Sequence, residues 1–205
     1  MMTDLLAIFV ILFSFAMMNS KQITRASTQS TNNATTASQT QNVMPVYDRF
    51  NSFVETVNNH IVENGLTQQL SVSNQGDGVI LLRVADSALF ESGRADLDDK
   101  AKKLLGSISK ILTADADSIK MVRIEGHTDN RPINNRQFKN NWSLSTSRAV
   151  SVLERLSVLS KSKLGPEKFS AVGYGEFHPI ANNDTAAGRT KNRRVDFIIE
   201  TATSD

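Results

Sequence analysis

Residues 124–156 read IEGHTDNRPINNRQFKNNWSLSTSRAVSVLERL, and this stretch decides the fold. Its first residues belong to a segment, 121–125, in which apolar and polar side chains alternate, so we predict a strand that ends at Glu125. Residues 143–159 carry apolar side chains at helical spacing and predict an amphipathic helix. Between the two we expect a surface loop that presents residues 127–130, because loops at strand ends commonly carry ligand-binding groups.

The flanking segments continue the alternation of strands and helices. Strands are predicted at residues 79–84, 169–172 and 194–200, and a further helix at residues 96–112. The resulting order, β-α-β-α-β-β, predicts an α/β sandwich in which helices cover one face of a mixed sheet.

The N-terminal residues differ in composition from this domain. Residues 1–18 are almost entirely apolar and, as a helix, would span roughly 27 Å, slightly less than a bilayer core of about 30 Å. No basic segment precedes them and no small-residue cleavage site follows, so we expect a single transmembrane helix over residues 1–19 rather than a signal peptide. Residues 20–44 are rich in Ser, Thr, Asn and Gln, which predicts a flexible linker to a folded domain at residues 45–205.

The charges near the apolar segment raise a question of orientation. Lys21 and Arg25 follow it, and the positive-inside rule would therefore place the C-terminal domain in the cytoplasm. A short apolar helix without a basic flank before it suggests that the chain starts inside the membrane segment. We accordingly expect the helix to be truncated at its N-terminus.

A further helix is predicted at the start of the folded domain, with Gly65 suited to its C-terminal end. Two roles remain open for it: packing against its own domain, or forming a dimer. Its apolar side chains recur at spacings of three and four residues: Tyr47, Phe50, Val54, Val57 and Ile61.

Composition excludes several classes of protein. A net charge of +2 without a run of Lys or Arg gives no indication of nucleic-acid binding. Cysteine is absent, which excludes a disulfide scaffold, a thiolate nucleophile and a Cys-ligated metal site. The three histidines show no metal-site spacing, so we expect neither a metal nor a cofactor.

Four separated motifs give the sequence a family resemblance. GHTDN at 126–130 with NWSLSTSRAVSV at 141–152, LFESGRADL at 89–97, GYGEFHPIANN at 173–183 and GRTKNRRVDFII at 188–199 resemble the OmpA-like peptidoglycan-binding domain, in the same order. The resemblance covers about residues 79–200. It implies that Asp129 and Arg148 bind the diaminopimelate residue of the wall peptide.

Other residues of these motifs complete the predicted site: Thr128, His127, Asn141, Leu144 and Arg193. For His127 a structural role in the loop is the alternative. Trp142 and Leu144 are expected to pack the start of the helix rather than to contact sugar.

The implied chemistry is reasonable for these side chains. The free end of diaminopimelate carries an ammonium and a carboxylate on one carbon, and a carboxylate and a guanidinium held close together match both charges. Arg binds a carboxylate through two parallel hydrogen bonds, which Lys cannot do. A structural salt bridge between Asp129 and Arg148 remains the alternative. If the two residues bind the ligand, we expect both side chains at the surface, where their loss leaves the fold nearly intact. Unfolding on their loss would favour the structural bridge.

The N-terminal segment resembles the transmembrane helix of the MotB family of flagellar stator proteins. This implies a non-enzymatic protein of the bacterial inner membrane, a homodimer, whose single helix joins a MotA-type channel subunit in conducting ions while the extracytoplasmic domain holds the wall. The ion-carrying aspartate of that family would precede Met1, and Asp4 lies one helical turn further on as a weaker candidate for the ion path. Alternatives are a type VI secretion wall anchor, a generic wall-to-membrane tether and a wall hydrolase.

Overall fold

The computed structural model describes residues 46–202, with the exception of residues 64, 66 and 68. The predicted membrane helix, the linker and Asp4 therefore lie outside the described residues. Within residues that are described, none of the helices has both the length and the apolar character needed to cross a membrane.

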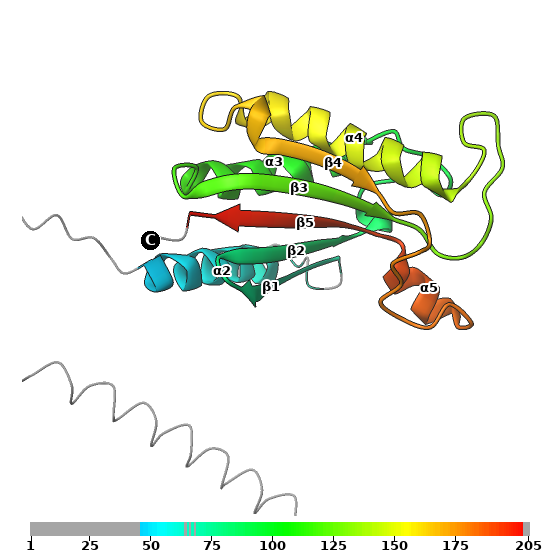
Figure 1. Cartoon of the computed structure of the whole chain (residues 1–205), viewed down its shortest axis with the longest axis horizontal. Coiled ribbons are helices and arrows are strands. Elements are labelled where there is room, and N and C mark those ends of the chain that lie inside the picture. Colours follow the sequence, from blue (N-terminus) through cyan, green and yellow to red (C-terminus); the bar gives the residue numbers. More distant parts are fainter. Residues whose placement is uncertain (1–45, 64, 66, 68, 203–205) are drawn as a thin grey trace, which may run out of the picture. The chain divides into compact units, whose positions relative to one another are not determined.

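A five-stranded mixed sheet, ordered β1-β2-β5-β3-β4, forms the centre of the domain (Figure 1). Strands β3 and β4 run parallel, and every other neighbouring pair is antiparallel. The parallel pair needs a crossover connection, which contains helix α4 (Asn141–Ser160). The strands are β1 (Leu70–Gly76), β2 (Val79–Ala85), β3 (Ile119–His127), β4 (Phe169–Gly173) and β5 (Arg194–Thr201).

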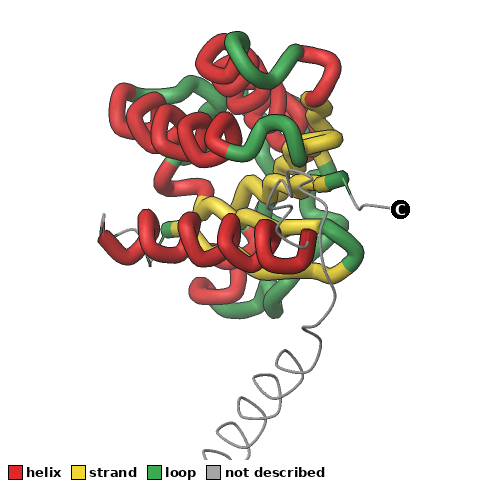
Figure 2. The backbone as a smooth tube through the Cα atoms, turned by 90° about the vertical axis from the view of Figure 1, so that its left-hand side faces the viewer, coloured by secondary structure: helices red, strands yellow, loops and turns green. Residues whose placement is uncertain are grey.

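Helices α2 (Val46–Glu63), α3 (Asp99–Ala114) and α4 share one hydrophobic core with the sheet (Figure 2). The core contains alternate residues of the strands, such as Ile80 of β2 and Phe197 of β5, so it lies against one sheet face. This confirms the predicted mixed sheet with helices on one face. The remaining short elements are the helix α5 (Ala186–Asn192) and the 3-10 turns η1 (Asp86–Ala88) and η2 (Pro166–Lys168).

The other face of the sheet carries several ion pairs. Arg83 of β2 lies directly opposite Asp196 of β5, and its Nε is 2.8 Å from the carboxylate. On β3, Arg123 lies 2.8 Å from Glu125 and 3.2 Å from Glu200. These pairs satisfy charged groups that are only partly exposed to water.

Two glycines bring α4 unusually close to the sheet. A Cβ atom at Gly126 of β3 would collide with the carbonyl group of Ser145, and one at Gly173 of β4 would collide with Thr146. Asn140 then fixes the start of α4 through a capping box with Ser143. The N-terminal half of α4 is therefore held against the ends of β3 and β4.

The first described helix packs on its own domain, and its role in a dimer stays a prediction. Val57 and Ile61 of α2 are buried in the shared core, as expected if the helix packs on its own domain. Gly65 has a φ of 65° and follows the helix, which is the conformation expected of a C-terminal glycine. Strand β1 and helix α5 were absent from the predicted order, and β3 continues two residues beyond Glu125.

Candidate ligand-binding site

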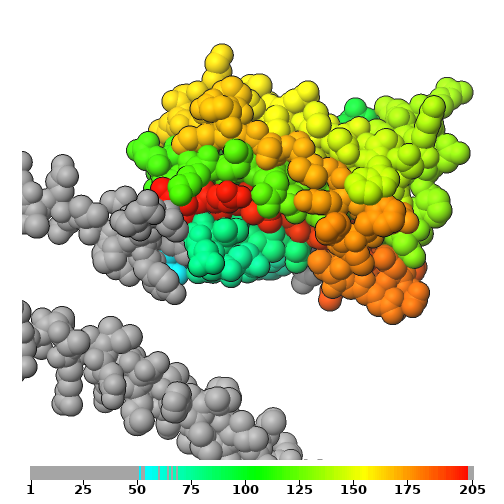
Figure 3. Space-filling model, viewed as in Figure 1, coloured from blue at the N-terminus to red at the C-terminus, as the bar shows by residue number. Residues whose placement is uncertain are grey.

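Three chain segments meet at one end of the sheet. The pairings of Ala85 and His127 with Arg194 place the end of β2, the end of β3 and the start of β5 side by side. Figure 3 shows the segment near residues 175–190, in orange, against the yellow-green segment near residues 130–142 at this end. The geometry of the sheet thus gathers residues that are far apart in sequence.

A cavity of about 310 Å³ opens at this end of the sheet, and we call it the ligand cavity. Six of the seven residues predicted for the site line it. The lining consists of Asp86, Ser92, Gly93, Thr128, Asp129, Arg131, Pro132, Ile133, Asn141, Leu144, Arg148 and Arg193.

Arg148 is almost completely buried, with 2% of its surface exposed, which differs from the expected surface position. Its Nη1 lies 2.6 Å from Oδ1 of Asp86, and its Nε donates a hydrogen bond of 2.8 Å to the carbonyl oxygen of Arg94. The guanidinium also lies over the ring of Phe90, 5.1 Å from its centroid. The segment after β2 therefore holds the guanidinium in one orientation.

Asp86 is the counter-ion of Arg148, and sequence reasoning missed it. Burial raises the pKa of Asp86 to about 6, although the neighbouring charges of Arg148 and Arg193 oppose this rise. Its position directly after an apolar strand was visible in the sequence, but nothing there indicated that the carboxylate would be buried. The cavity thus contains a carboxyl group that titrates close to neutral pH.

Asp129 is also buried, with 4% exposed, and so is not a surface group either. Its Oδ2 accepts a hydrogen bond of 2.6 Å from Nη1 of Arg193 and one of 3.1 Å from Nε of Arg131. Burial alone would raise the pKa of Asp129, but the hydrogen bonds from Arg193 and Arg131 outweigh burial and hold it below the ordinary value. Asp129 therefore stays ionised at neutral pH.

Asp129 and Arg148 line the same cavity without forming an ion pair with each other in the described structure. Each has its own counter-ion, Arg193 for Asp129 and Asp86 for Arg148. The alternative of a direct structural bridge between Asp129 and Arg148 is therefore wrong.

The polar residues around the cavity hold its loop in place. Nδ2 of Asn141 donates hydrogen bonds to the carbonyl oxygens of Asp129, at 3.2 Å, and Arg131, at 3.1 Å, and also to Glu176. The backbone N–H of Thr128 donates to the carbonyl oxygen of Gly175, while its buried hydroxyl has no partner in the described structure. Neither Arg131 nor Glu176 was predicted for the site, because polar loop residues carry no distinguishing sequence signal.

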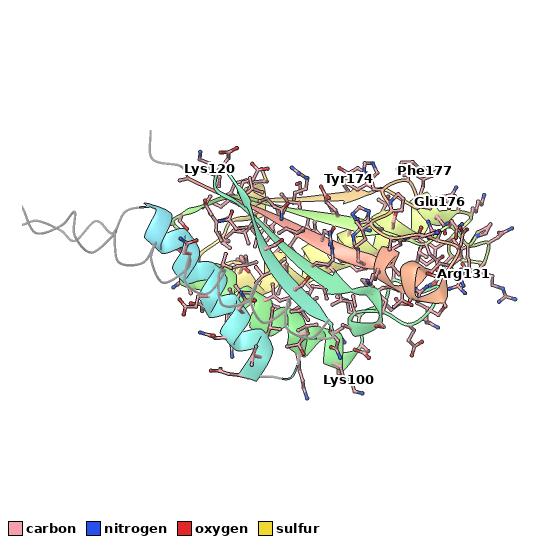
Figure 4. The ribbon with its side chains drawn as sticks, turned by 90° about the horizontal axis from the view of Figure 1, so that it is seen from below. Lys100, Lys120, Arg131, Tyr174, Glu176 and Phe177 are labelled. Atoms are coloured by element: carbon pink, nitrogen blue, oxygen red, sulfur yellow. The ribbon has the colours of Figure 1, made fainter. Side chains whose placement is uncertain are left out.

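Leu144 lines the cavity and packs against Ala95 and Phe138 in a small apolar cluster, which agrees with its predicted packing at the start of the helix. Trp142 does not pack inward: 48% of it is exposed, and its ring stacks on Phe177 with centroids 5.1 Å apart. Figure 4 labels Phe177, Glu176 and Arg131 at the same end of the molecule. Leu144 therefore packs the start of α4 from within, whereas Trp142 packs there only through its stack on Phe177 and stays half exposed.

His127 is the predicted site residue that does not line the ligand cavity. It is the last residue of β3, 3% exposed, and its ring stacks on Tyr174 with centroids 5.3 Å apart. Burial lowers the pKa of His127, and the carboxylate of Glu125, 3.8 Å from Nε2, opposes this only in part. His127 is therefore mostly neutral at physiological pH. Among the described residues, no group of three His, Asp or Glu side chains is arranged to hold a metal ion.

Comparisons with known proteins agree with this arrangement. Residues 89–193 match the OmpA family. Motility protein B of Bacillus subtilis (strain 168) is 40% identical over 143 residues, which cover 70% of this chain and 53% of that protein. The chain therefore spans about half the length of this relative.

Two solved structures have a similar fold. A MotB-like protein from Desulfovibrio vulgaris superposes with a TM-score of 0.67 and 26% identity, covering 77% of this chain and 94% of that one. The cell wall anchor of the type VI secretion system from Pseudomonas aeruginosa has a TM-score of 0.62 and 28% identity, covering 70% of this chain and 96% of that one. The chain thus belongs to the OmpA family and is a protein of the motility protein B type.

Proposed function

We propose that this protein binds peptidoglycan non-covalently and thereby anchors an ion-conducting stator complex of a flagellar motor to the cell wall. The observation that carries the binding proposal is the composition of the ligand cavity. Its lining contains the ionised carboxylate of Asp129 and the oriented guanidinium of Arg148, each held by a separate partner.

The zwitterionic end of diaminopimelate is complementary to these two groups. Its ammonium would bind Asp129 and its carboxylate would bind Arg148. Both side chains are already held by other contacts, so little conformational freedom is lost on binding. Each charge-assisted hydrogen bond contributes about 1.5–3 kcal/mol. The remaining walls would be formed by Thr128, Asn141, Leu144 and Arg193. His127 lies outside the cavity, and its stack on Tyr174 would help to position the end of β3 next to the ligand.

Similarity to motility protein B supports a proposal for the role of the whole protein. The protein would be a homodimer in the bacterial inner membrane, crossing it once, and would pair with a MotA-type channel subunit. Its C-terminal domain would hold the complex to the wall from the extracytoplasmic side, so that ion flow produces torque. No chemical step is needed for this role, and we do not propose an enzymatic activity.

The main alternative is a wall anchor of a type VI secretion system, which the structural similarity to the Pseudomonas aeruginosa anchor supports. Both roles use the same wall-binding domain, so wall binding cannot separate them. Co-expression with a MotA-type channel subunit does: co-purification from membranes is expected for a stator protein. Failure to co-purify, with a channel subunit that assembles normally with its own partner, would favour the alternative.

Wall binding is tested by co-sedimentation of the full chain with peptidoglycan sacculi that contain diaminopimelate. Asp129→Asn keeps the size of the side chain but removes the charge that would bind the ammonium, so we expect binding to fall at least tenfold. Asp99→Asn is the matched control, because Asp99 is 93% exposed and lies outside the cavity. Retention of the folded wild-type protein in the supernatant would reject the proposal.

A further inference from the structure

A second cavity, of about 270 Å³, adjoins the ligand cavity, and we call it the basic cavity. Arg193 contributes to the lining of both. Its Nη1 donates to Asp129, which lines the ligand cavity, and its Nη2 donates to the hydroxyl of Thr190, which lines the basic cavity. Figure 1 shows α5, which carries Thr190, beside the ends of β2 and β5. The guanidinium of Arg193 therefore forms a partition between the two spaces.

The charges around the basic cavity are unbalanced. Four cationic side chains line it, and none of the described lining residues is acidic: Arg83, Lys191, Arg193 and Arg194. Arg83 and Arg194 share the single carboxylate of Asp196, at 2.8 and 2.9 Å. Lys191 is exposed and has no ion-pair partner in the described structure. A cluster that served only to neutralise Asp196 would not need Lys191 or a second guanidinium.

The lining is not purely polar. Ala85 and the half-exposed Ile180 add apolar surface next to the cations, and the aliphatic parts of the Arg and Lys side chains extend it. A ligand that fits both features carries an anionic group on a short apolar carbon unit. A terminal carboxylate beside a methyl group, as in an alanine residue at the end of a peptide, has this composition.

We infer that the basic cavity is a second subsite, which takes the carboxylate of the wall-peptide residue that follows diaminopimelate. This inference rests on the proposed function, because it assumes that diaminopimelate occupies the ligand cavity. The shared wall at Arg193 lets one peptide contact both spaces. Two linked contacts raise the affinity of the whole peptide above that of either contact alone.

The test compares two synthetic diaminopimelate peptides that end in alanine, one with a free carboxylate and one with a carboxamide, by calorimetry on the full chain. We expect the free carboxylate to improve the affinity about tenfold.

Lys191→Gln should reduce this preference for the free carboxylate, and the double variant Arg83→Gln with Lys191→Gln should abolish it. Arg83→Gln leaves Asp196 paired with Arg194, so the fold is expected to persist. Arg123→Gln is the matched control, since it removes an equally exposed guanidinium outside both cavities.

The outcomes separate the two proposals. Equal affinity of the wild-type protein for the two peptides overturns the subsite and leaves the proposed function standing. A wild-type protein that binds neither peptide overturns both. Inorganic phosphate and N-acetylalanine serve as competitors for the basic cavity. If phosphate displaces the free-carboxylate peptide much more strongly than N-acetylalanine does, the subsite prefers phosphate and the inference is overturned.

Discussion

At the scale of single residues, the environment of Arg148 decides what its substitution does. The family resemblance identified Arg148, but no sequence pattern indicates that the side chain is buried against Asp86. Removing one partner of a buried pair leaves an uncompensated charge, which is far more costly than losing a surface group. The structure contradicts the surface position on which the expectation of an intact Arg148→Ala fold rested, and we expect this variant to be destabilised instead.

We expect Arg148→Ala to lower the free energy of unfolding by about 3–5 kcal/mol at pH 8. The loss should be smaller at pH 5, because Asp86, whose pKa is raised by burial, then becomes neutral. Arg148→Lys keeps a charge but cannot donate to both Asp86 and the carbonyl of Arg94 in the same geometry, so it should bind sacculi poorly. Urea unfolding at the two pH values and co-sedimentation measure these effects. A loss below 1 kcal/mol for Arg148→Ala at pH 8 would contradict the buried-pair argument.

Asp86 itself predicts a specific pH dependence. Its folded pKa, about 6, lies above the ordinary value of 3.8, so the folded state binds a proton more tightly than the unfolded state does. The stability from this group is fully present below pH 3.8 and is lost as the pH rises through 6, by about 3 kcal/mol. Asp86→Asn cannot titrate, so the stability difference between wild type and variant should change across this window and level off above it. The lowered pKa values of Asp129 and Glu125 change the stability with pH in the opposite direction. Because both proteins contain these two groups, their contribution largely cancels in the stability difference between wild type and variant. A constant difference from pH 4 to 7 would show that Asp86 has an ordinary pKa.

At the scale of elements, periodicity predicted those with a buried face and missed those without one. Strand β2 alternates buried and half-buried residues and was predicted within one residue. Strand β1 lies at the edge of the sheet, and after Val72 its residues are polar and exposed, so no apolar alternation marks it. The sequence Gly76-Asp77-Gly78, with φ positive at all three, was a usable hairpin signal before β2. Helix α5 has seven residues and no continuous apolar stripe, so the spacing of apolar residues cannot predict it.

The contact between α4 and the loop after β4 includes a stacked aromatic pair, Trp142 and Phe177. Phe177→Ala should lower the free energy of unfolding by about 0.5–1.5 kcal/mol. Because Trp142 is the single tryptophan of the chain, its fluorescence should shift to longer wavelength when the phenyl ring no longer covers it. Val158→Ala is a control on the exposed side of α4 and should change stability by less than about 0.5 kcal/mol. Unchanged emission in Phe177→Ala would mean that the two rings do not stack in solution.

At the scale of the whole molecule, the sequence motifs predicted which residues line the site but not the ion pairs that these residues form. Motifs placed Asp129, Arg148 and Arg193 around one cavity, because strand order brings their segments to one end of the sheet. Which carboxylate faces which guanidinium depends on side-chain burial and on long-range pairing, and neither is encoded in local periodicity. Asp86 was missed for this reason, whereas Arg131 is an exposed loop residue that pairs with the nearby Asp129 and carries no distinguishing signal.

Helix α2 has two faces that bear differently on the proposed homodimer. Its buried face, with Val57 and Ile61, is occupied by the domain's own core, while Val62 is 66% exposed on the helix. Deleting residues 46–64 should therefore unfold the domain instead of producing a folded monomer, and deletion is a poor test of dimerisation. Single substitutions separate the two roles.

Ile61→Ala should lower the free energy of unfolding by about 2–5 kcal/mol and leave the sedimentation coefficient unchanged, because Ile61 faces the core. Val62→Asp should leave stability nearly unchanged, and it should convert the dimer to a monomer because a charge would replace an apolar contact on the exposed face of α2. Analytical ultracentrifugation at several protein concentrations measures both variants. A dimer that persists in Val62→Asp would place the interface elsewhere on the domain, and a wild-type protein that stays monomeric would reject the homodimer.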